Sequence, residues 1–155
     1  MRKITESDKG IYILELFARD GFKIGIKKFI DLSFPKGYYY YVGSAQKNLS
    51  HRLKRHAKKT KIIHWHIDHL TSHSGISLKN IFIIPNAPKE IEWKLANSFE
   101  ANFNTNIIAH GFGNGDTRET KTHLFFKSKS IPYSHFCSVY QSIVRLIPSS
   151  IETFG

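Results

Sequence analysis

Cationic side chains gather on one flank of a predicted helix, and their types and spacing suit contact with phosphate. The helix is predicted over residues 46–59. At 100° per residue, Arg52, His56 and Lys59 fall together beside its apolar stripe, with Arg55 slightly further round. His56 lies one turn after Arg52, so both can reach one phosphate, or His56 can relay a proton. A charge run of this kind is also typical of a solvated face.

The overall charge also favours a polyanionic partner. The 155 residues include 23 Lys and Arg against 12 Asp and Glu, which gives a formal net charge of +11. Cations that neutralise phosphates release condensed counterions, so nucleic acid is the expected partner. The basic residues form no cluster beside an apolar anchor, and no run of about 18 apolar residues could span a bilayer, so we expect no membrane partner.

The compartment and the domain organisation follow from composition. Cys137 is the single cysteine, which excludes a disulfide and a thiolate metal cluster. The first ten residues lack the apolar stretch of a secretory signal, so we expect a cytoplasmic protein. A chain of 155 residues with 41% hydrophobic content predicts one domain, 1–155, with a core of its own.

Strands and helices alternate irregularly along the chain. Strands are predicted at 10–17, 22–30, 38–42, 77–84 and, as the last strand, 122–126. Helices are predicted at 46–59 (stripe Leu49, Leu53, Ala57), at 64–70, after Asn86 and Pro88 (stripe Ile91, Leu95, Phe99, Phe103), and from Pro132 to Pro148 (stripe Phe136, Val139, Ile143, Ile147). These elements predict an α+β fold, a small mixed and mostly antiparallel sheet flanked by helices.

Five ordered motifs resemble one nuclease family. The segments are Gly10-Ile11-Tyr12, Tyr41–Ala45 (YVGSA), Arg52–His56 (RLKRH), His64–Asp68 (HWHID) and Gly111–Phe125 (GFG…HLF). The first two resemble the paired motifs of the GIY-YIG nuclease superfamily, and each lies on a predicted strand. The set is most similar to a prokaryotic branch of that superfamily, and the resemblance covers residues 10–126.

The resemblance implies an endonuclease that hydrolyses phosphodiester bonds in DNA. Such chemistry needs an activated water and neutralised phosphoryl charge. The resemblance makes Tyr12 the general base with Tyr41 in support, and gives Arg52 the phosphate and His56 a second catalytic role. Glu92 is the implied ligand of Mg²⁺ (or Mn²⁺), a metal that takes one or two carboxylates and keeps its waters. Arg52 and the metal would also lower the pKa of Tyr12.

The sequence departs from the family pattern in several places. The interval between Tyr12 and Tyr41 is longer than is usual, so residues 22–37 are an insertion that we expect to hold an extra strand. The related branch has cysteines where this chain has Trp93, Thr117 and Thr120. The loop from Asp116 to His123 is one residue longer.

Each candidate residue also has a structural interpretation. Tyr12 and Tyr41 could be ordinary strand tyrosines. Glu92 could merely complement a helix N-terminus, with Glu100 as the reserve metal ligand. The roles of Asp116 and His123 stay open. The glycines of 111–115 lack the lysine and spacing of a phosphate loop, so we expect no nucleotide cofactor.

Histidines and one aspartate also raise a zinc hypothesis. His69 and His73 are four residues apart, as are His64 and Asp68. No thiolate and no HExxH motif accompanies them. We therefore favour core packing for Trp65 and Ile67, and a role in the nucleic-acid surface or in a local hydrogen bond for some of the histidines. The roles of His64, His66 and Asp68 stay open.

Three functions remain in competition. The first is the nuclease, in which Arg55, Lys58 and Lys59 add phosphate contacts. The second is a nucleic-acid-binding module with a degenerate, inactive site, which needs only the basic surface. The third is a partner-docking protein that uses the predicted C-terminal helix.

Overall fold

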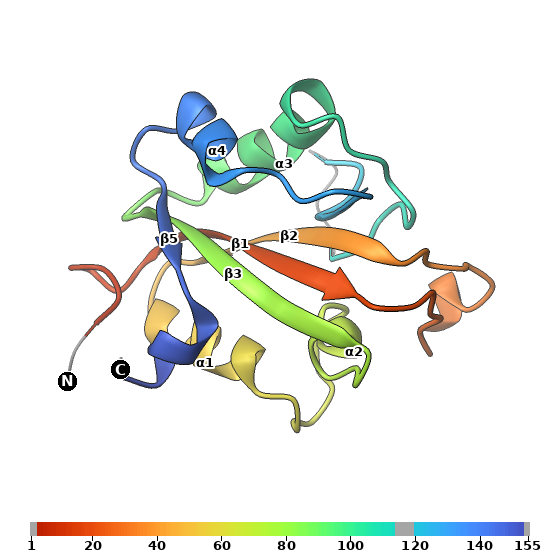
Figure 1. Cartoon of the computed structure of the whole chain (residues 1–155). Helices are drawn as coiled ribbons and strands as arrows, with labels where there is room; N and C mark the ends of the chain where they lie inside the picture. The colour runs from red at the N-terminus through yellow and green to blue at the C-terminus, as the bar shows by residue number, and fades with distance from the viewer. Residues whose placement is uncertain (1–2, 114–119, 154–155) are drawn as a thin grey trace.

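One antiparallel sheet organises the chain. The structure, a computed structural model, describes residues 3–113 and 120–153 (Figure 1). Within these residues five strands form the sheet in the order β4-β2-β1-β3-β5, and every neighbouring pair is antiparallel. The strands are β1 (Gly10–Ala18), β2 (Gly37–Ala45), β3 (Ile76–Pro85), β4 (Leu124–Lys127) and β5 (Val144–Leu146).

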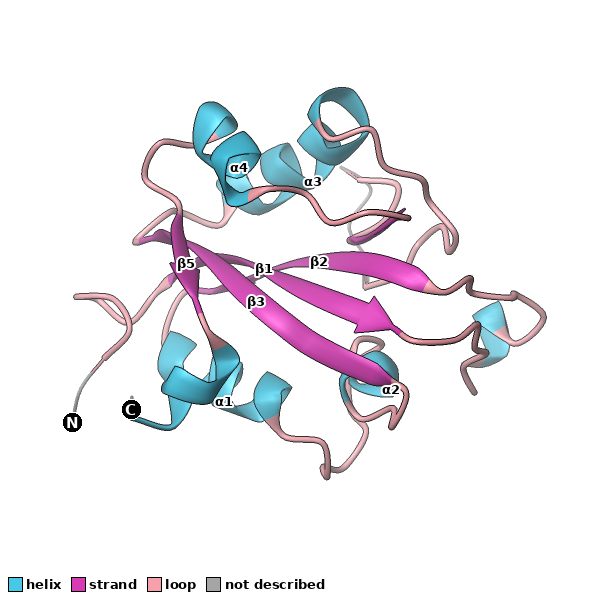
Figure 2. Cartoon of the chain, in the orientation of Figure 1, coloured by secondary structure: helices cyan, strands magenta, loops and turns pink. Residues whose placement is uncertain are grey.

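Helices cover both faces of the sheet. On one face lie α1 (Leu49–Ala57), α2 (Asp68–Thr71) and the C-terminal 3-10 helix η2 (Pro148–Thr153). On the other face lie α3 (Glu90–Asn102) and α4 (Tyr133–Val139), as Figures 1 and 2 show. The expected α+β class, a sheet flanked by helices, is therefore confirmed.

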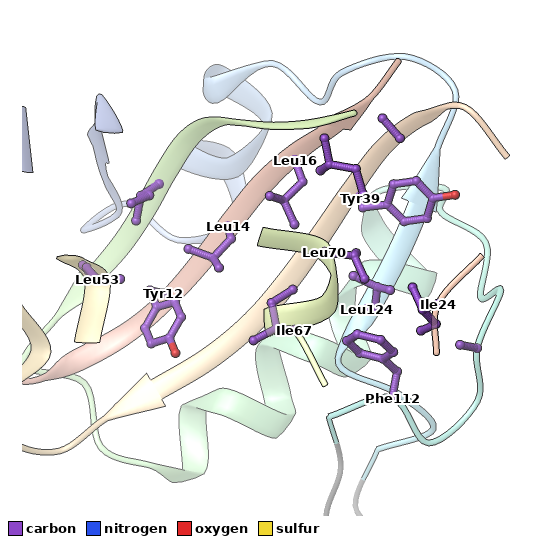
Figure 3. Packing of buried hydrophobic residues seen from close by; sticks show 14 of the residues in the cluster. Tyr12, Leu14, Leu16, Ile24, Tyr39, Leu53, Ile67, Leu70, Phe112 and Leu124 are labelled. Carbon is purple, nitrogen blue, oxygen red and sulfur yellow. The ribbon is translucent and has the colours of Figure 1, made fainter. Parts of the chain in front are cut away.

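The central strand β1 is apolar on both sides because both of its faces are covered. Tyr12 and Leu14 point into the core beneath α1 and α2 (Figure 3). Ile11 and Ile13 point into the second core beneath α3 and α4. Successive residues of a strand point to opposite faces of the sheet. A strand that is covered by helices on both faces therefore needs apolar residues at nearly every position.

The strand predicted at 22–30 is wrong. Phe22 forms one isolated bridge with Phe34, and Lys27–Phe29 is a short 3-10 helix, η1. Phe22, Ile24 and Phe29 are nevertheless buried in the core beneath α1 and α2, while the lysines between them are exposed. The segment thus keeps the inside–outside alternation of a strand without a pairing partner, and the inserted residues form a loop.

The long C-terminal helix is also wrong. Helix α4 ends at Val139, and the chain then turns into β5, which pairs with Ile81–Ile83 of β3. The four-residue stripe therefore does not share one face: Ile143 is buried while Ile147 is 54% exposed. Pairing the outer edge of β3 outweighed continuation of the helix, so the strand at 122–126 is not the last one.

The buried face of helix α1 includes His56, where the sequence predicted Ala57. Leu49 and Leu53 are fully buried, as the stripe predicts, but Ala57 is exposed and His56 is 1% exposed. At 100° per residue, His56 lies closer than Ala57 to the line through the two leucines. The imidazole is therefore part of the inner face of α1 rather than of its cationic flank.

A buried carboxylate ties α1 to α2. The predicted helix over 64–70 is shorter, beginning at Asp68. The Asp68 carboxylate accepts two bonds from the Arg55 guanidinium (2.7 and 2.8 Å) and one each from the backbone N–H groups of His64 and Trp65 (2.8 Å). Burial alone would raise the pKa of Asp68, but these bonds outweigh burial and hold the pKa at about 2.

We predict that Asp68 gives the fold an acid-sensitive component of stability. A carboxyl with a depressed pKa stabilises the fold above its unfolded pKa of about 3.9, and this is lost as the pH falls towards 2. Asp68→Asn should lower the free energy of unfolding at pH 7 by about 2–4 kcal/mol, because Arg55 then loses its partner. Urea unfolding from pH 7 to pH 2 measures this.

The matched control is Asp20→Asn, which removes the carboxylate of an exposed pair with Arg19. It should leave the unfolding curve unchanged. Equal stability of Asp68→Asn and the wild type at pH 7 would contradict the structural role of Asp68.

Candidate active site

A cavity opens at the edge of the sheet where β4 ends. Strand β4 pairs with Tyr38–Tyr41 only, so within the described residues no strand covers that side of Gly43 and Ser44 in β2. Residues from both helical layers can therefore meet over this edge. The cavity has a volume of about 380 Å³, and we call it the Tyr12 cavity; its lining residues are Tyr12, Tyr41, Gly43, Ser44, Arg52, His64, Trp65, His66, Glu92 and Gly113.

The Tyr12 ring lies across Gly43, its partner in the β1–β2 register. A Cβ atom on Gly43 would lie 2.5 Å from Cζ and 2.6 Å from Oη of Tyr12, well inside van der Waals contact. Any larger residue at 43 would displace the phenol. The glycine of the YVG segment thus has a physical reason: it clears the space in which the Tyr12 side chain reaches the cavity.

The buried side chain of His56 contacts the hydroxyl of Tyr12. The Nε2 atom of His56 lies 2.8 Å from Tyr12 Oη, and the rings are tilted at 5.4 Å between centroids. Burial lowers the pKa of His56 to about 3, so the imidazole is neutral at physiological pH. His56 does not line the cavity, and it acts on Tyr12 rather than on a bound phosphate.

The tautomer of His56 follows from its second nitrogen. Among the described residues, Nδ1 of His56 is buried without a hydrogen-bond partner. A buried N–H without an acceptor is rarer and costlier than an empty lone pair. We therefore infer that Nε2 carries the proton and donates to Tyr12 Oη. The hydroxyl proton of Tyr12 is then directed away from His56.

Tyr12 is a neutral phenol in this environment. Burial raises its pKa well above the ordinary value near 10, and electrostatic interactions with the neighbouring Tyr41 and Glu92 raise it further. Arg52 lowers it through its charge and a hydrogen bond, as the sequence led us to expect, but burial outweighs this influence. Ionisation of Tyr12 therefore needs more positive charge than Arg52 alone provides.

Arg52 is held at the cavity by an oxygen and a ring. Its guanidinium donates to the carbonyl oxygen of Ser44 at 2.6 Å. Its Cζ lies 5.0 Å from the centre of the Trp65 ring, a cation–π distance, and Arg55 lies 4.4 Å from the same ring. The Ser44 bond and the Trp65 contact fix the direction of the fork, and they leave other guanidinium donors for a ligand.

Glu92 reaches the cavity from the opposite helical layer. It lies in the first turn of α3, and it is half-buried at the cavity wall. Within the described part of the chain it forms no ion pair with Lys or Arg. After burial, its charge is the largest influence raising the pKa of Tyr41. The reserve ligand Glu100 is exposed, pairs with Lys121 at 3.4 Å and does not line the cavity.

The cations that were expected to bind phosphate have different partners in the structure. The guanidinium of Arg55 is bound by Asp68 and by the carbonyl of Ile62. The ammonium of Lys59 donates to the carbonyls of His73 and Ile76. Lys58 is exposed, and with Lys54 it lines a second hollow of about 540 Å³ beside Pro148–Ile151. Of the four cations expected to contact phosphate, Arg52 is the one that lines the Tyr12 cavity.

Two of the four histidines between α1 and β3 accept hydrogen bonds from the backbone, one from a nearby residue and one from a distant segment. His66 Nδ1 accepts from the backbone N–H of Gly113 (2.9 Å), and His73 Nδ1 accepts from that of Gly75 (2.9 Å). Asp68 is saturated by its own partners. No group of three or more His, Cys, Asp or Glu side chains that could hold a metal is found in residues 3–113 and 120–153.

The turn before residue 114 completes the wall. Gly113 has a φ of +74°, and a Cβ there would lie 3.0 Å from the Tyr41 ring. His123, whose role the sequence left open, is buried behind this turn and its Nδ1 lies 3.2 Å from the Val42 carbonyl oxygen. Asp116 lies outside the described residues.

Sequence reasoning missed the part that Trp65 plays. The sequence favoured core packing for Trp65, and the side chain is in fact half-buried, lining the cavity and contacting two arginines. A signal was present: a tryptophan close in sequence to a cationic helix can stack on its guanidinium groups. Ile67, by contrast, is fully buried as predicted.

The donor set of the cavity fits magnesium better than zinc. One carboxylate with phenolic oxygens nearby suits an ion that keeps several waters and takes phosphate oxygens from a substrate. Zinc prefers three or four closely placed nitrogen, sulfur or oxygen ligands. If Mg²⁺ or Mn²⁺ binds, Glu92 is the residue placed to hold it.

The chain belongs to the family described as the domain of unknown function DUF123, which matches residues 11–145. Comparisons with curated proteins and with solved structures gave no significant match. None of the described helices is long and apolar enough to cross a membrane.

We predict that His56 stays neutral and Nε2-protonated down to about pH 4. Its folded pKa of about 3 lies below the unfolded value of about 6.5, so it destabilises the fold progressively as the pH falls from about 6.5 towards 3. Correlation of ring ¹⁵N and ¹H signals by NMR reports both the tautomer and the titration.

Tyr12→Phe is the control for this experiment. It removes the hydroxyl partner of Nε2, so that nitrogen signal should move. The pKa of His56 should remain low, because burial is its largest cause. Titration of His56 near pH 6.5 in the wild type would refute the buried neutral imidazole.

Proposed function

We propose that this protein is a divalent-metal-dependent endonuclease that hydrolyses phosphodiester bonds in DNA. One observation carries the proposal: Tyr12, Arg52 and Glu92, from β1, α1 and α3, line the same cavity. Their types match the roles implied by the resemblance to GIY-YIG nucleases. Helix packing alone does not require a phenol, a guanidinium and a carboxylate to meet at one edge.

Each side chain has a distinct part in the proposed reaction. Arg52, held by Ser44 and Trp65, neutralises the charge that develops on the phosphoryl oxygens. Glu92 holds the divalent ion. When bound, that ion supplies Lewis-acid chemistry and a water of lowered pKa. Tyr12 would act as the phenolate, whose oxygen can accept the proton of the attacking water, while His56 positions that oxygen.

The electrostatics of the cavity couple metal binding to the protonation of Tyr12. The Glu92 charge helps to keep the Tyr12 pKa high, and the Tyr41 phenol has a raised pKa for the same reasons. A divalent ion at Glu92 offsets this charge and favours the phenolate. The proposed cleavage rate should therefore rise with pH while the metal is bound.

The raised pKa of Tyr12 also favours a second function, a nucleic-acid-binding module with an inactive site. The buried phenol of Tyr12 is a poor base as it stands, and within residues 3–113 and 120–153 Glu92 is the one carboxylate that lines the cavity. A nucleic-acid-binding module with an inactive site would show both features. The docking hypothesis is weaker, because the long helix it needs is absent and Phe136 of α4 is fully buried in the second core.

Three variants should separate the enzyme from the binding module. Arg52→Ala should cut the cleavage rate by about a hundredfold or more, while binding falls far less because other cations remain. Glu92→Ala should abolish metal-dependent turnover. Tyr12→Phe removes one hydroxyl and should also slow cleavage strongly. Plasmid nicking with Mg²⁺ or Mn²⁺, against an EDTA control, measures all three.

Two matched controls lie outside the cavity. Glu100→Ala changes a glutamate of the same helix as Glu92, and Lys54→Ala removes a cation of the same helix as Arg52. Both should keep cleavage near the wild-type rate. If all three cavity variants cleave as well as the wild type, the active site is elsewhere. Tight, salt-sensitive binding without cleavage under any metal would establish the inactive module instead.

A further inference from the structure

The loop between α1 and α2 has two lysines, Lys59 and Lys61, whose ammonium groups bind other parts of the protein, and two isoleucines that are exposed. The ammonium of Lys59 donates to the backbone carbonyls of His73 and Ile76, as noted above. Lys61 donates to the carbonyl of His56 and, at 2.7 Å, to the hydroxyl of Thr71. Between and after them, Ile62 is 88% exposed and Ile63 is 44% exposed. This reverses the usual distribution, in which lysine ends face water and isoleucine is buried.

The exposed isoleucines are carried on a fixed backbone. The carbonyl of Ile62 accepts from Arg55 at 3.0 Å, and the N–H of His64 donates to Asp68 at 2.8 Å. The two bonds lead to the same buried ion pair. A single exposed apolar residue is common on protein surfaces. Ile62 and Ile63, which we call the tip, are exposed on a backbone that is bonded to Arg55 and Asp68. Such an arrangement is less readily explained by folding alone.

The tip is connected to the wall of the Tyr12 cavity. The Ile62 carbonyl accepts from Arg55, whose guanidinium lies 4.4 Å from the Trp65 ring, and Trp65 and His64, which is two residues after Ile62, both line the cavity. Two residues span at most about 7 Å, which corresponds to about two base steps of about 3.4 Å along a strand. A phosphate bound by Arg52 would therefore have its neighbouring bases within reach of Ile62.

We propose that Ile62, flanked by Ile63, inserts into the base stack of DNA beside the phosphate held in the Tyr12 cavity. The proposal rests on the proposed function and narrows its substrate to duplex DNA with a step that opens readily, such as a mismatch. Isoleucine is among the side chains that nucleic-acid-binding proteins use as apolar wedges between bases. The net charge of +11 complements the DNA backbone on either side.

A wedge of this kind makes selection depend on how easily the DNA opens. Unstacking costs less where pairing is already disturbed or where the step is a flexible pyrimidine–purine step. The energy is recovered as Ile62 leaves water and as the displaced backbone settles against Arg52. Mismatched duplex should therefore be bound and cut in preference to matched duplex of the same length.

The test uses 2-aminopurine, a base whose fluorescence rises on unstacking. Duplexes carry it at successive positions around a mismatch and are titrated with full-length Tyr12→Phe, so that cleavage does not interfere. We expect at least about a threefold rise at one or two steps from the cutting position. Adding Ile62→Ala should abolish the rise, while the dependence of binding on salt is unchanged because the cations remain.

Ile147→Ala is the matched control. Ile147 is also an isoleucine, 54% exposed, and it follows β5 at the opposite edge of the sheet from the cavity. It should leave the fluorescence rise intact. In proteins with Tyr12 restored, Ile62→Ala should also remove the preference for mismatched over matched duplex, and Ile147→Ala should not.

The possible results separate the wedge from the nuclease. Cleavage with no fluorescence rise, or a rise that survives Ile62→Ala, overturns the wedge and leaves the nuclease standing. Absence of both binding and cleavage overturns the two together. If the wild type is a dimer by sedimentation and Ile62→Ala is a monomer, the tip is a contact between copies of the chain and the wedge is wrong.

Discussion

The Asp68 carboxylate accepts four hydrogen bonds, two from the Arg55 guanidinium and two from the backbone at His64 and Trp65. Those bonds fix the chain between α1 and α2, which contains no other regular structure. Trp65 is thereby set against Arg55 and Arg52, and Arg52 is directed at the cavity. A buried ion pair often stabilises a fold no more than a well-packed apolar pair would, but it holds its two partners in one geometry. The position of Arg52, which we propose binds phosphate, depends on that geometry.

The second constraint is the unequal length of β2 and β4. Because β4 stops opposite Tyr41, the end of β2 is open to both helical layers. Tyr12 and Arg52 approach from one layer, and Glu92 approaches from the other. His56 and Gly43 then set the phenol by a hydrogen bond and by an absent side chain. The cavity is therefore a consequence of strand register as much as of the motifs themselves.

Much of this architecture could be predicted from the sequence, and particular residues show where prediction stopped. The β-branched and aromatic residues of 10–17 predicted β1 correctly, and the four-residue spacing of Leu95 and Phe99 predicted α3, which buries both residues. In 22–30 the alternation of apolar and polar residues produced a loop, since alternation reports burial and not pairing.

The sequence predicted which residues line the cavity better than it predicted the contacts that hold them there. Four of the five residues to which the resemblance gave a role line the cavity, namely Tyr12, Tyr41, Arg52 and Glu92, and helical spacing alone had singled out only Arg52 among them. The bond between Arg55 and Asp68 and the stacking of Trp65 depend on how α1 and α2 are placed in three dimensions. Spacing along the chain could not distinguish a free Arg55 from a paired one.

The central claim is that one divalent ion and one phosphate meet in the Tyr12 cavity. Anomalous scattering from Mn²⁺ in crystals of Tyr12→Phe with a short DNA duplex tests it directly. We expect one peak at about 2.1 Å from a Glu92 carboxylate oxygen, with a DNA phosphate between that ion and Arg52. A manganese ion bound away from Glu92, or DNA bound with the cavity empty of phosphate, would contradict the account.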